Sequence, residues 1–111
     1  MIKELKNSEE IKSFISKKGY SVIDVYSDNC PACVKMDKEY KTLATKVDSS
    51  RLAKINASDN TDFLSEIGVR SLPAFVVFLD GQMQHLKTGF INVSKMEEIL
   101  KWLLPKESKE N

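Results

Sequence analysis

The first periodic pattern in the chain predicts a helix. Ile11, Phe14 and Ile15 recur at helical spacing, so they would lie on one side of a helix. Residues 7–10, which read NSEE, are typical of a helix start, because a capping side chain is followed by acids in the first turn. We expect Gly19 to close this helix, since glycine adopts the left-handed conformation common at helix ends.

Two β-rich apolar runs and two more helical segments follow. SVIDVYS (residues 21–27) is almost continuously apolar, which favours a strand that is buried on both faces. We expect a long helix from residue 31 to about residue 47, and then a strand in RLAKINAS (residues 51–58). TDFLSEIG (residues 61–68) predicts a short helix that ends at Gly68.

The last third of the chain predicts a hairpin and a helix. AFVVFLDGQMQHLKTG (residues 74–89) places two β-rich runs on either side of an Asp-Gly pair, which is preferred in tight hairpins. SKMEEILKWLL (residues 94–104) predicts a final helix with Ser94 as its N-cap, stopped by Pro105. We expect residues 105–111 to form a mobile tail.

The order of these elements predicts an α/β fold. With a short leading strand, the order is β-α-β-α-β-α-β-β-α, so crossover connections come first and an antiparallel hairpin follows. Such a chain forms a mixed sheet with helices on both faces. We assign a single domain to residues 1–104, because 111 residues are enough for one hydrophobic core and too few for two.

Composition and charge narrow the class of protein. Apolar residues make up 41 % of the chain, which indicates a folded domain. The 17 Lys and Arg residues balance 16 Asp and Glu residues, so we expect no general attraction to nucleic acid or to an anionic membrane. No apolar run approaches the roughly 18 residues that span a bilayer, and the first residues lack the apolar segment of a signal peptide. We therefore expect a cytoplasmic, reducing location, where lasting structural disulfides are rare.

Both cysteines of the chain lie in DNCPAC (residues 28–33), between a predicted buried strand and a predicted long helix. Proline is well tolerated at the first helical position, so Pro31 in that place would make Cys30 the N-cap. The free amides of the first turn and the helix dipole stabilise an anion there. We therefore expect the pKa of Cys30 to lie below that of an ordinary thiol, which would make Cys30 a nucleophile.

Cys33 follows three residues later, so the two side chains would share one helix face at a distance that a disulfide can bridge. A nucleophile at the cap and a second thiol one turn further form a reversible dithiol. One alternative is two buried cysteines that are close only by chance, and another is half of a metal site. Zinc needs about four ligands and His85 is the only histidine. A metal site would therefore need two copies of the chain, and we expect no metal.

From about Tyr20 to Leu104 the chain resembles the thioredoxin family. VIDVYSDNCPACVKM is similar to the family's strand, active-site loop and second helix, and LAKINAS to its third strand. SEIGVRSLPAFVVFLDG resembles the family's cis-proline loop and hairpin, and KTGF its glycine loop. The resemblance implies the thioredoxin fold, in which four helices flank a central, mixed five-stranded sheet. It also implies the activity of a protein disulfide reductase.

The resemblance implies roles for single residues as well. Cys30 matches the attacking cysteine, Cys33 the resolving cysteine, and Asp24 the buried acid beneath the disulfide. Lys54 matches the lysine near that acid, and Pro73 the cis-proline that faces the thiols. The residues expected to contact substrate around the disulfide are Asn29, Pro31, Ala32, Leu72, Pro73, Gly89 and Phe90.

The residue pattern by itself supports the role of Asp24. A carboxylate inside the apolar run VIDVY is costly to bury, so its pKa would rise and it would be able to accept the proton of Cys33. The alternative is an acid at the exposed edge of the strand. Lys54 alone indicates only a surface charge. The cis form of the Leu72-Pro73 bond is uncommon in general, and its expectation rests on the resemblance.

The sequence also departs from the family. Asn29 and Tyr26 stand where the family commonly has tryptophan, which changes the rim where partners dock. Lys38 replaces a proline of the long helix, and Phe90 replaces a small residue. Ala32 does not supply the cation of strongly oxidising relatives, which favours a reductant.

Partners and cofactors follow from the resemblance. It implies protein disulfide substrates, recharging by an NADPH-dependent flavoprotein thioredoxin reductase, and no bound cofactor. We expect a monomer. Two other functions stay open: a partner-binding module whose main role is non-catalytic, and a disulfide oxidant or isomerase, which would differ in redox potential.

Overall fold

The computed structural model describes residues 2–104, and its elements follow the predicted order. The strands and α-helices of this part are β1 (Lys3–Leu5), α1 (Ser8–Ile15), β2 (Tyr20–Tyr26), α2 (Pro31–Leu43), β3 (Leu52–Asn56), α3 (Thr61–Ile67), β4 (Ala74–Leu79), β5 (Gln82–Thr88) and α4 (Val93–Leu103). None of these helices is long and apolar enough to cross a membrane. The predicted tail, with Pro105, lies outside the described residues.

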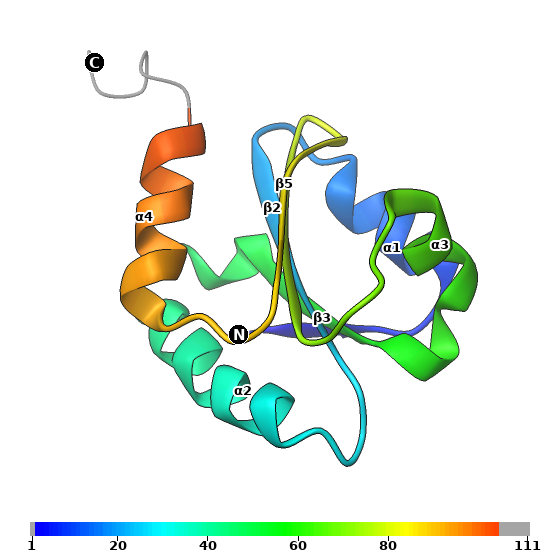
Figure 1. Cartoon of the computed structure of the whole chain (residues 1–111). Coiled ribbons are helices and arrows are strands. Elements are labelled where there is room, and N and C mark those ends of the chain that lie inside the picture. Colours follow the sequence, from blue (N-terminus) through cyan, green and yellow to red (C-terminus); the bar gives the residue numbers. More distant parts are fainter. Residues whose placement is uncertain (1, 105–111) are drawn as a thin grey trace.

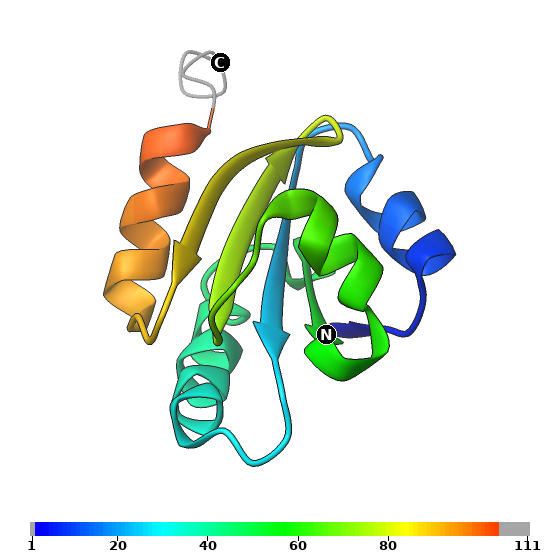
Figure 2. The same cartoon turned by 45° about the vertical axis from the view of Figure 1, so that its right-hand side comes forward.

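The strands form one mixed sheet in the order β1-β3-β2-β4-β5, which confirms the predicted fold class (Figures 1 and 2). β1, β3 and β2 run parallel, whereas β4 is antiparallel to β2, and β5 is antiparallel to β4. Parallel neighbours need crossover connections, which the helices supply. The β4–β5 hairpin turns through Asp80 and Gly81, both at positive φ, as the Asp-Gly pair predicts.

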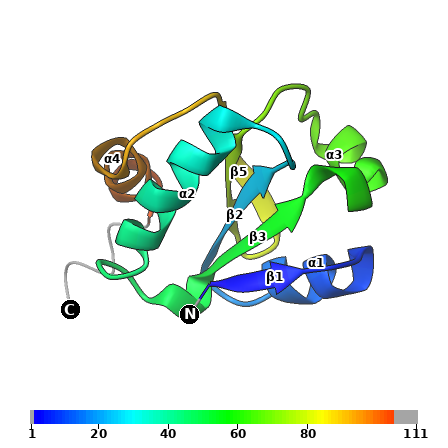
Figure 3. The same cartoon turned by 90° about the horizontal axis from the view of Figure 1, so that it is seen from below.

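Helices cover both faces of the sheet: α2 and α4 lie on one face, and α1 and α3 on the other (Figure 3). Side chains alternate along a strand, so β2 sends Ile23 and Val25 into the core under α1 and α3, and Val22 into the core under α2 and α4. Asp24 follows Val22 by two residues. It therefore lies on the same face as α2.

Capping residues explain where the first helices begin and end. The side chain of Asn7 accepts a hydrogen bond from the Glu10 N–H at 2.9 Å, and Gly68 ends α3 in the left-handed conformation, both as predicted. Gly19 does not close α1, which ends at Ile15. Instead, Gly19 has a φ of 92° in the following loop, and its N–H donates to an oxygen of the hairpin residue Asp80 at 2.7 Å.

Two other predicted boundaries are wrong. α4 is capped by Asn92 rather than Ser94, because the Asn92 side chain accepts a hydrogen bond from the Lys95 N–H at 2.9 Å. Asn and Ser cap helices about equally well, so the first residue of the helix depends on which side chain reaches a free amide. α2 ends at Leu43 instead of about Val47, because the chain tightens into a turn there.

Three loops meet at the carboxyl end of β2 (Figure 2). The loop that carries DNCPAC leaves from this end. Val25 of β2 pairs with Ala74 of β4, so Pro73 comes to the same end of the sheet. The N–H of Gly89, which follows β5, donates to the carbonyl oxygen of Pro73 at 2.8 Å. The fold thus gathers the residues that the sequence analysis assigned to one site.

Candidate active site

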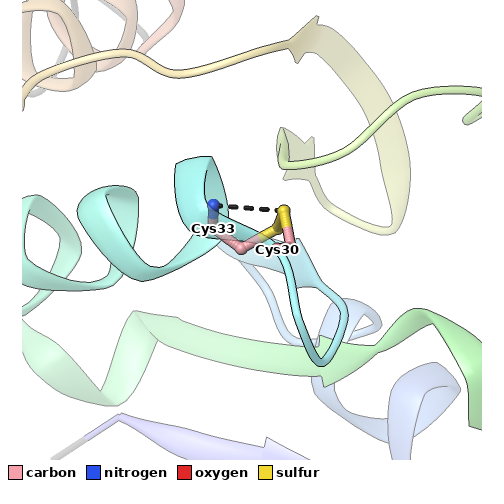
Figure 4. The surroundings of a disulfide bond; sticks show 2 residues. All are labelled: Cys30 and Cys33. Carbon is pink, nitrogen blue, oxygen red and sulfur yellow. Dashed lines mark hydrogen bonds between the residues drawn. A yellow bond between two sulfur atoms is a disulfide. The ribbon is translucent and has the colours of Figure 1, made fainter.

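The start of α2 positions the first cysteine. Asn29 has a φ of 57°, in the left-handed region that asparagine adopts more readily than most residues. After this turn Cys30 is extended, and Pro31 occupies the first turn of the helix. Cys30 is the N-cap, as predicted: the Cys33 N–H donates to Cys30 Sγ at 3.2 Å (Figure 4). The sulfur therefore lies where helix amides and the helix dipole favour a thiolate.

Cys30 and Cys33 form a disulfide, with their Cα atoms 5.2 Å apart (Figure 4). The two residues differ in exposure: Cys30 is half-buried, whereas Cys33 is buried. Between them, Pro31 is exposed and Ala32 is half-buried. A partner molecule therefore reaches the sulfur of Cys30 more easily than that of Cys33, which suits an attacking and a resolving thiol.

Two neighbouring loops form the rim of the site. The Leu72-Pro73 peptide bond is cis, as the resemblance implied, and Pro73 is buried beside the end of β2. Gly89 is held to Pro73 by its backbone hydrogen bond. Phe90, next to Gly89, exposes 46 % of its surface, and Val34, next to Cys33 on α2, exposes 62 %. Large apolar side chains are thus presented to solvent on two elements at this end.

Asp24 lies in the middle of β2 and exposes only 1 % of its surface, which excludes the exposed-edge alternative. Its Oδ1 accepts no hydrogen bond from residues 2–104. Burial raises the pKa of Asp24 from its ordinary 3.8 to about 7; the charge of Asp37 adds to this rise, Lys54 opposes it, and Glu4 adds to it. The carboxyl group therefore exchanges its proton near neutral pH.

Lys54 is the neighbour of Asp24 in the β2–β3 register, but its ammonium group pairs with another acid. Lys54 Nζ lies 3.0 Å from Asp37 Oδ1 on α2, and Lys41 Nζ lies 3.1 Å from Asp37 Oδ2. Partial burial opposes the ionisation of Asp37, yet the hydrogen bonds from these two lysines hold its pKa below the ordinary value. Lys54 also lies over the ring of Tyr26, 5.0 Å from its centre.

The geometry supplies the parts of a thiol–disulfide exchange site. A capping cysteine and a buried cysteine share the first turn of α2, and an acid with a pKa near neutrality lies on the sheet face that α2 covers. A cavity of about 420 Å³ borders Cys33 and is also lined by Tyr26, Asp37 and Lys54. Within residues 2–104, no group of three His, Cys, Asp or Glu side chains is arranged to hold a metal ion.

Asp37 and Tyr40 also belong to this region, although no motif in the sequence points to them. They follow Cys33 by four and seven residues, which places all three on one face of α2, and this spacing is the available signal. Tyr40 is fully buried, and its hydroxyl donates to the carbonyl oxygen of Ala53 at 2.7 Å and lies 3.2 Å from that of Val22. Tyr40 thereby ties α2 to both β2 and β3.

Comparison with known sequences identifies relatives along nearly the whole chain. The family model described as Thioredoxin matches residues 2–103. The thioredoxin of Mycoplasma pneumoniae is 26 % identical over 100 residues, which cover 90 % of this chain and 98 % of that protein. Thioredoxin-like protein 1 of Schizosaccharomyces pombe is 32 % identical over 88 residues, which cover 78 % of this chain and 30 % of that protein.

Solved structures have the same fold. The oxidised mitochondrial thioredoxin 3 of Saccharomyces cerevisiae matches with a TM-score of 0.82 and 28 % identity, over 92 % of this chain and 95 % of that one. A mutant thioredoxin from Halobacterium salinarum matches with a TM-score of 0.85 and 24 % identity, over 93 % of this chain and 90 % of that one. With its paired cysteines at the start of α2, the chain belongs to the thioredoxin family of thiol–disulfide oxidoreductases.

Proposed function

We propose that this protein reduces protein disulfides through the Cys30–Cys33 dithiol. The Cys30 thiolate attacks a substrate disulfide; the substrate S–S bond breaks, a Cys30–substrate disulfide forms, and the first substrate sulfur leaves as a thiolate and takes a proton. Cys33, as a thiolate, then attacks Cys30 Sγ and releases the second substrate sulfur. The substrate gains two electrons, and the protein is left with the disulfide that the structure contains.

The position of Cys30 as the N-cap of α2 carries this proposal. A thiolate in this place is stabilised by the amide of Cys33 and by the helix dipole, so Cys30 is the better nucleophile. Cys33 is buried one turn further along the helix, where it meets the mixed disulfide rather than a second substrate. The order of the two attacks follows from this difference in exposure.

Asp24 is proposed as the base that takes the proton of Cys33. Its pKa of about 7 lets the carboxyl group accept a proton and return it near neutral pH. The alternation of β2 supports the assignment, because Asp24 lies on the face that α2 covers. Lys54 belongs to the same cluster of charges, next to Asp24 in register.

The remaining parts of the proposal concern partners. Phe90 and Val34 are apolar side chains exposed at the end of the molecule that carries the disulfide. Exposed apolar side chains of this kind favour a protein segment as substrate. We propose that an NADPH-dependent flavoprotein thioredoxin reductase returns two electrons to the disulfide after each turnover; membership of the family supports this. The cytoplasmic location, the monomeric state and the mobile tail stay predictions.

Cysteine substitutions test the proposal. Wild type should reduce insulin with dithiothreitol as electron source, and Cys30→Ser should lose this activity. Cys33→Ser should still attack once and accumulate a mixed disulfide, which mass spectrometry detects. Met83→Ser, at the hairpin end of the sheet, is the control and should keep wild-type activity. Activity retained in Cys30→Ser would overturn the proposal, and a wild type that does not reduce insulin would favour the non-catalytic partner-binding module.

A further inference from the structure

We propose that Asp37 is a positioning residue, which holds the ammonium group of Lys54 on α2 and so leaves the Asp24 carboxyl group without a cationic partner. The inference rests on the proposed function, in which Asp24 serves as the base for Cys33. It assigns a role in that reaction to the Lys54–Asp37 ion pair.

Lys54 lies between two acids of the sheet, because its register neighbours are Asp24 on β2 and Glu4 on β1. The helix α2 adds Asp37 as a third acid. Lys54 and Asp24 are direct neighbours on the parallel strands β3 and β2. Both lie on the α2 face, because Leu52 and Val22, two residues before each, pack into the core under α2. The lysine nevertheless extends toward the helix, where its Nζ lies 3.0 Å from Asp37 Oδ1.

A second ion pair helps to fix the position of the Asp37 carboxylate. Its second oxygen pairs with Lys41, one helical turn further, at 3.1 Å. The Asp37 and Lys54 side chains are 27 % and 26 % exposed, so their pairing is partly shielded from water. Lys41, at 68 % exposure, is the outer member of the cluster.

In the described part of the chain, the groups around Asp24 offer it no replacement for this lysine. Those that interact with its charge are Asp37 and Tyr40 on α2, Lys54 on β3 and Glu4 on β1. β4 places the apolar Phe75 next to Asp24, and α4 adds apolar side chains to the same core. Glu4 accepts a hydrogen bond from the Tyr26 hydroxyl at 2.8 Å. Lys54 is thus the cation among these groups, and Asp37 holds it.

The arrangement keeps Asp24 basic for two reasons that act in the same direction. The negative charge of Asp37 opposes ionisation of Asp24, and the ion pair keeps the lysine from bonding to it. Without the charge of Asp37, Lys54 would lose this partner and would be free to pair with its register neighbour Asp24, since Glu4 on its other side already accepts the Tyr26 hydroxyl. Asp24 would then ionise at lower pH and would be a weaker base for Cys33.

The direct test is the titration of the Asp24 carboxyl carbon by NMR in the oxidised protein. Asp37→Asn should lower the pKa of Asp24 by about one pH unit, since an opposite charge nearby shifts a carboxyl group by one to three. Asp62→Asn, which removes an exposed acid on α3, on the other face of the sheet, should leave it unchanged. An unchanged Asp24 titration in Asp37→Asn would overturn the inference.

A double-mutant comparison separates the position of the lysine from the charge of Asp37 alone. In a Lys54→Met background, Asp37→Asn should lower the pKa of Asp24 clearly less than it does when Lys54 is present. Equal falls in both backgrounds would mean that Asp37 acts only through its own charge, which would overturn the positioning role.

Kinetics then connect the cluster to the reaction. The pH profile of mixed-disulfide resolution in Asp37→Asn should move to lower pH together with the NMR titration. A profile that stays in place while the titration moves would overturn the link to catalysis. Failure of the proposed function is a separate result, since an Asp24→Asn variant that resolves at the wild-type rate would exclude the base and leave the NMR comparison standing.

Discussion

β2 buries one polar side chain on each face of the sheet, and the surroundings of the two differ. Ser21 faces α1 and α3, and its hydroxyl donates to the carbonyl oxygen of Phe14 at 3.2 Å. Asp24 faces α2 and α4, and within residues 2–104 its Oδ1 finds no hydrogen-bond partner. Ser21 is neutral and satisfied, whereas Asp24 is ionisable and incompletely satisfied. The second face also carries the disulfide and the Lys54–Asp37 pair.

The two faces of this small domain differ in how much stability they lose to buried polar groups. A buried polar group without a partner costs roughly 1–3 kcal/mol, and a buried charge costs more. On the α1/α3 face Ser21 is hydrogen-bonded, so this loss of stability does not arise. On the α2/α4 face Asp24 lowers the stability of the fold. Perturbed acids of this kind gather at functional sites. Substitutions on the first face should therefore change stability alone, and substitutions of Asp24 should change stability, its pH dependence and the chemistry.

The largest expected effect is on the pH dependence of stability in Asp24→Asn. Between 3.8, the ordinary pKa, and about 7, the pKa in the fold, folded Asp24 keeps a proton that the unfolded chain has lost. Wild-type stability therefore falls as pH rises through this window and levels off above it. The difference corresponds to about 4 kcal/mol. The stability advantage of the variant should grow by about this amount from pH 3 to pH 9 in urea unfolding of the oxidised protein.

Ser21→Ala is the matched control for this measurement on the opposite face of the same strand. It removes a neutral hydrogen bond, so it should lower the free energy of unfolding by about 1 kcal/mol at every pH. If the Asp24→Asn advantage were as independent of pH as the Ser21→Ala loss, Asp24 would not titrate near 7 in the fold, and the contrast between the faces would fail.

Ile11→Ala tests whether a loss of apolar packing on the α1/α3 face affects the disulfide site on the other face. Ile11 of α1 is fully buried in the core under α1 and α3, and truncating it should lower the free energy of unfolding by about 3 kcal/mol. The rate of alkylation of Cys30 in the folded, reduced protein should stay at the wild-type value. A change in that rate would show that the two faces are coupled, which the comparison does not expect.

Tyr40→Phe should have an effect as small as that of Ser21→Ala, and it probes a stabilising hydrogen bond on the α2/α4 face. The variant removes the hydroxyl that bonds to Ala53 and lies near the Val22 carbonyl oxygen, so it should cost about 1 kcal/mol in denaturant unfolding. Dichroism in the far ultraviolet should confirm that the sheet is intact. An unchanged free energy of unfolding would mean that the link from α2 to the two strands is not stabilising.

Most of the fold is predictable from the sequence because local signals and the fold agree. The apolar run of β2, the Asp-Gly turn and the caps at Asn7 and Gly68 are all found where the pattern places them. One error, at the start of α4, arises because two residues could cap the same helix. Asn92 and Ser94 are both good caps, and the geometry of the chain selects Asn92.

The candidate site is predictable only in part, for a physical reason. The cap at Cys30 is local, so its spacing to Pro31 and Cys33 is visible in the sequence. The partner of Lys54 is not visible, because Asp37 comes from a helix 17 residues earlier and meets the lysine only after the sheet has formed. Sequence pattern alone shows neither the register that brings Lys54 beside Asp24 nor the ion pair that turns it away.

The central claim is that Asp24 serves the resolving step of Cys33, and single-turnover kinetics test it most directly. Reduced protein is mixed with a substrate disulfide at pH 7, quenched by alkylation, and the mixed disulfide is quantified by mass spectrometry. General-base help contributes roughly 10²–10⁴-fold. Asp24→Asn should therefore form the mixed disulfide at about the wild-type rate and resolve it at least about 10²-fold more slowly. Resolution at the wild-type rate would contradict the account.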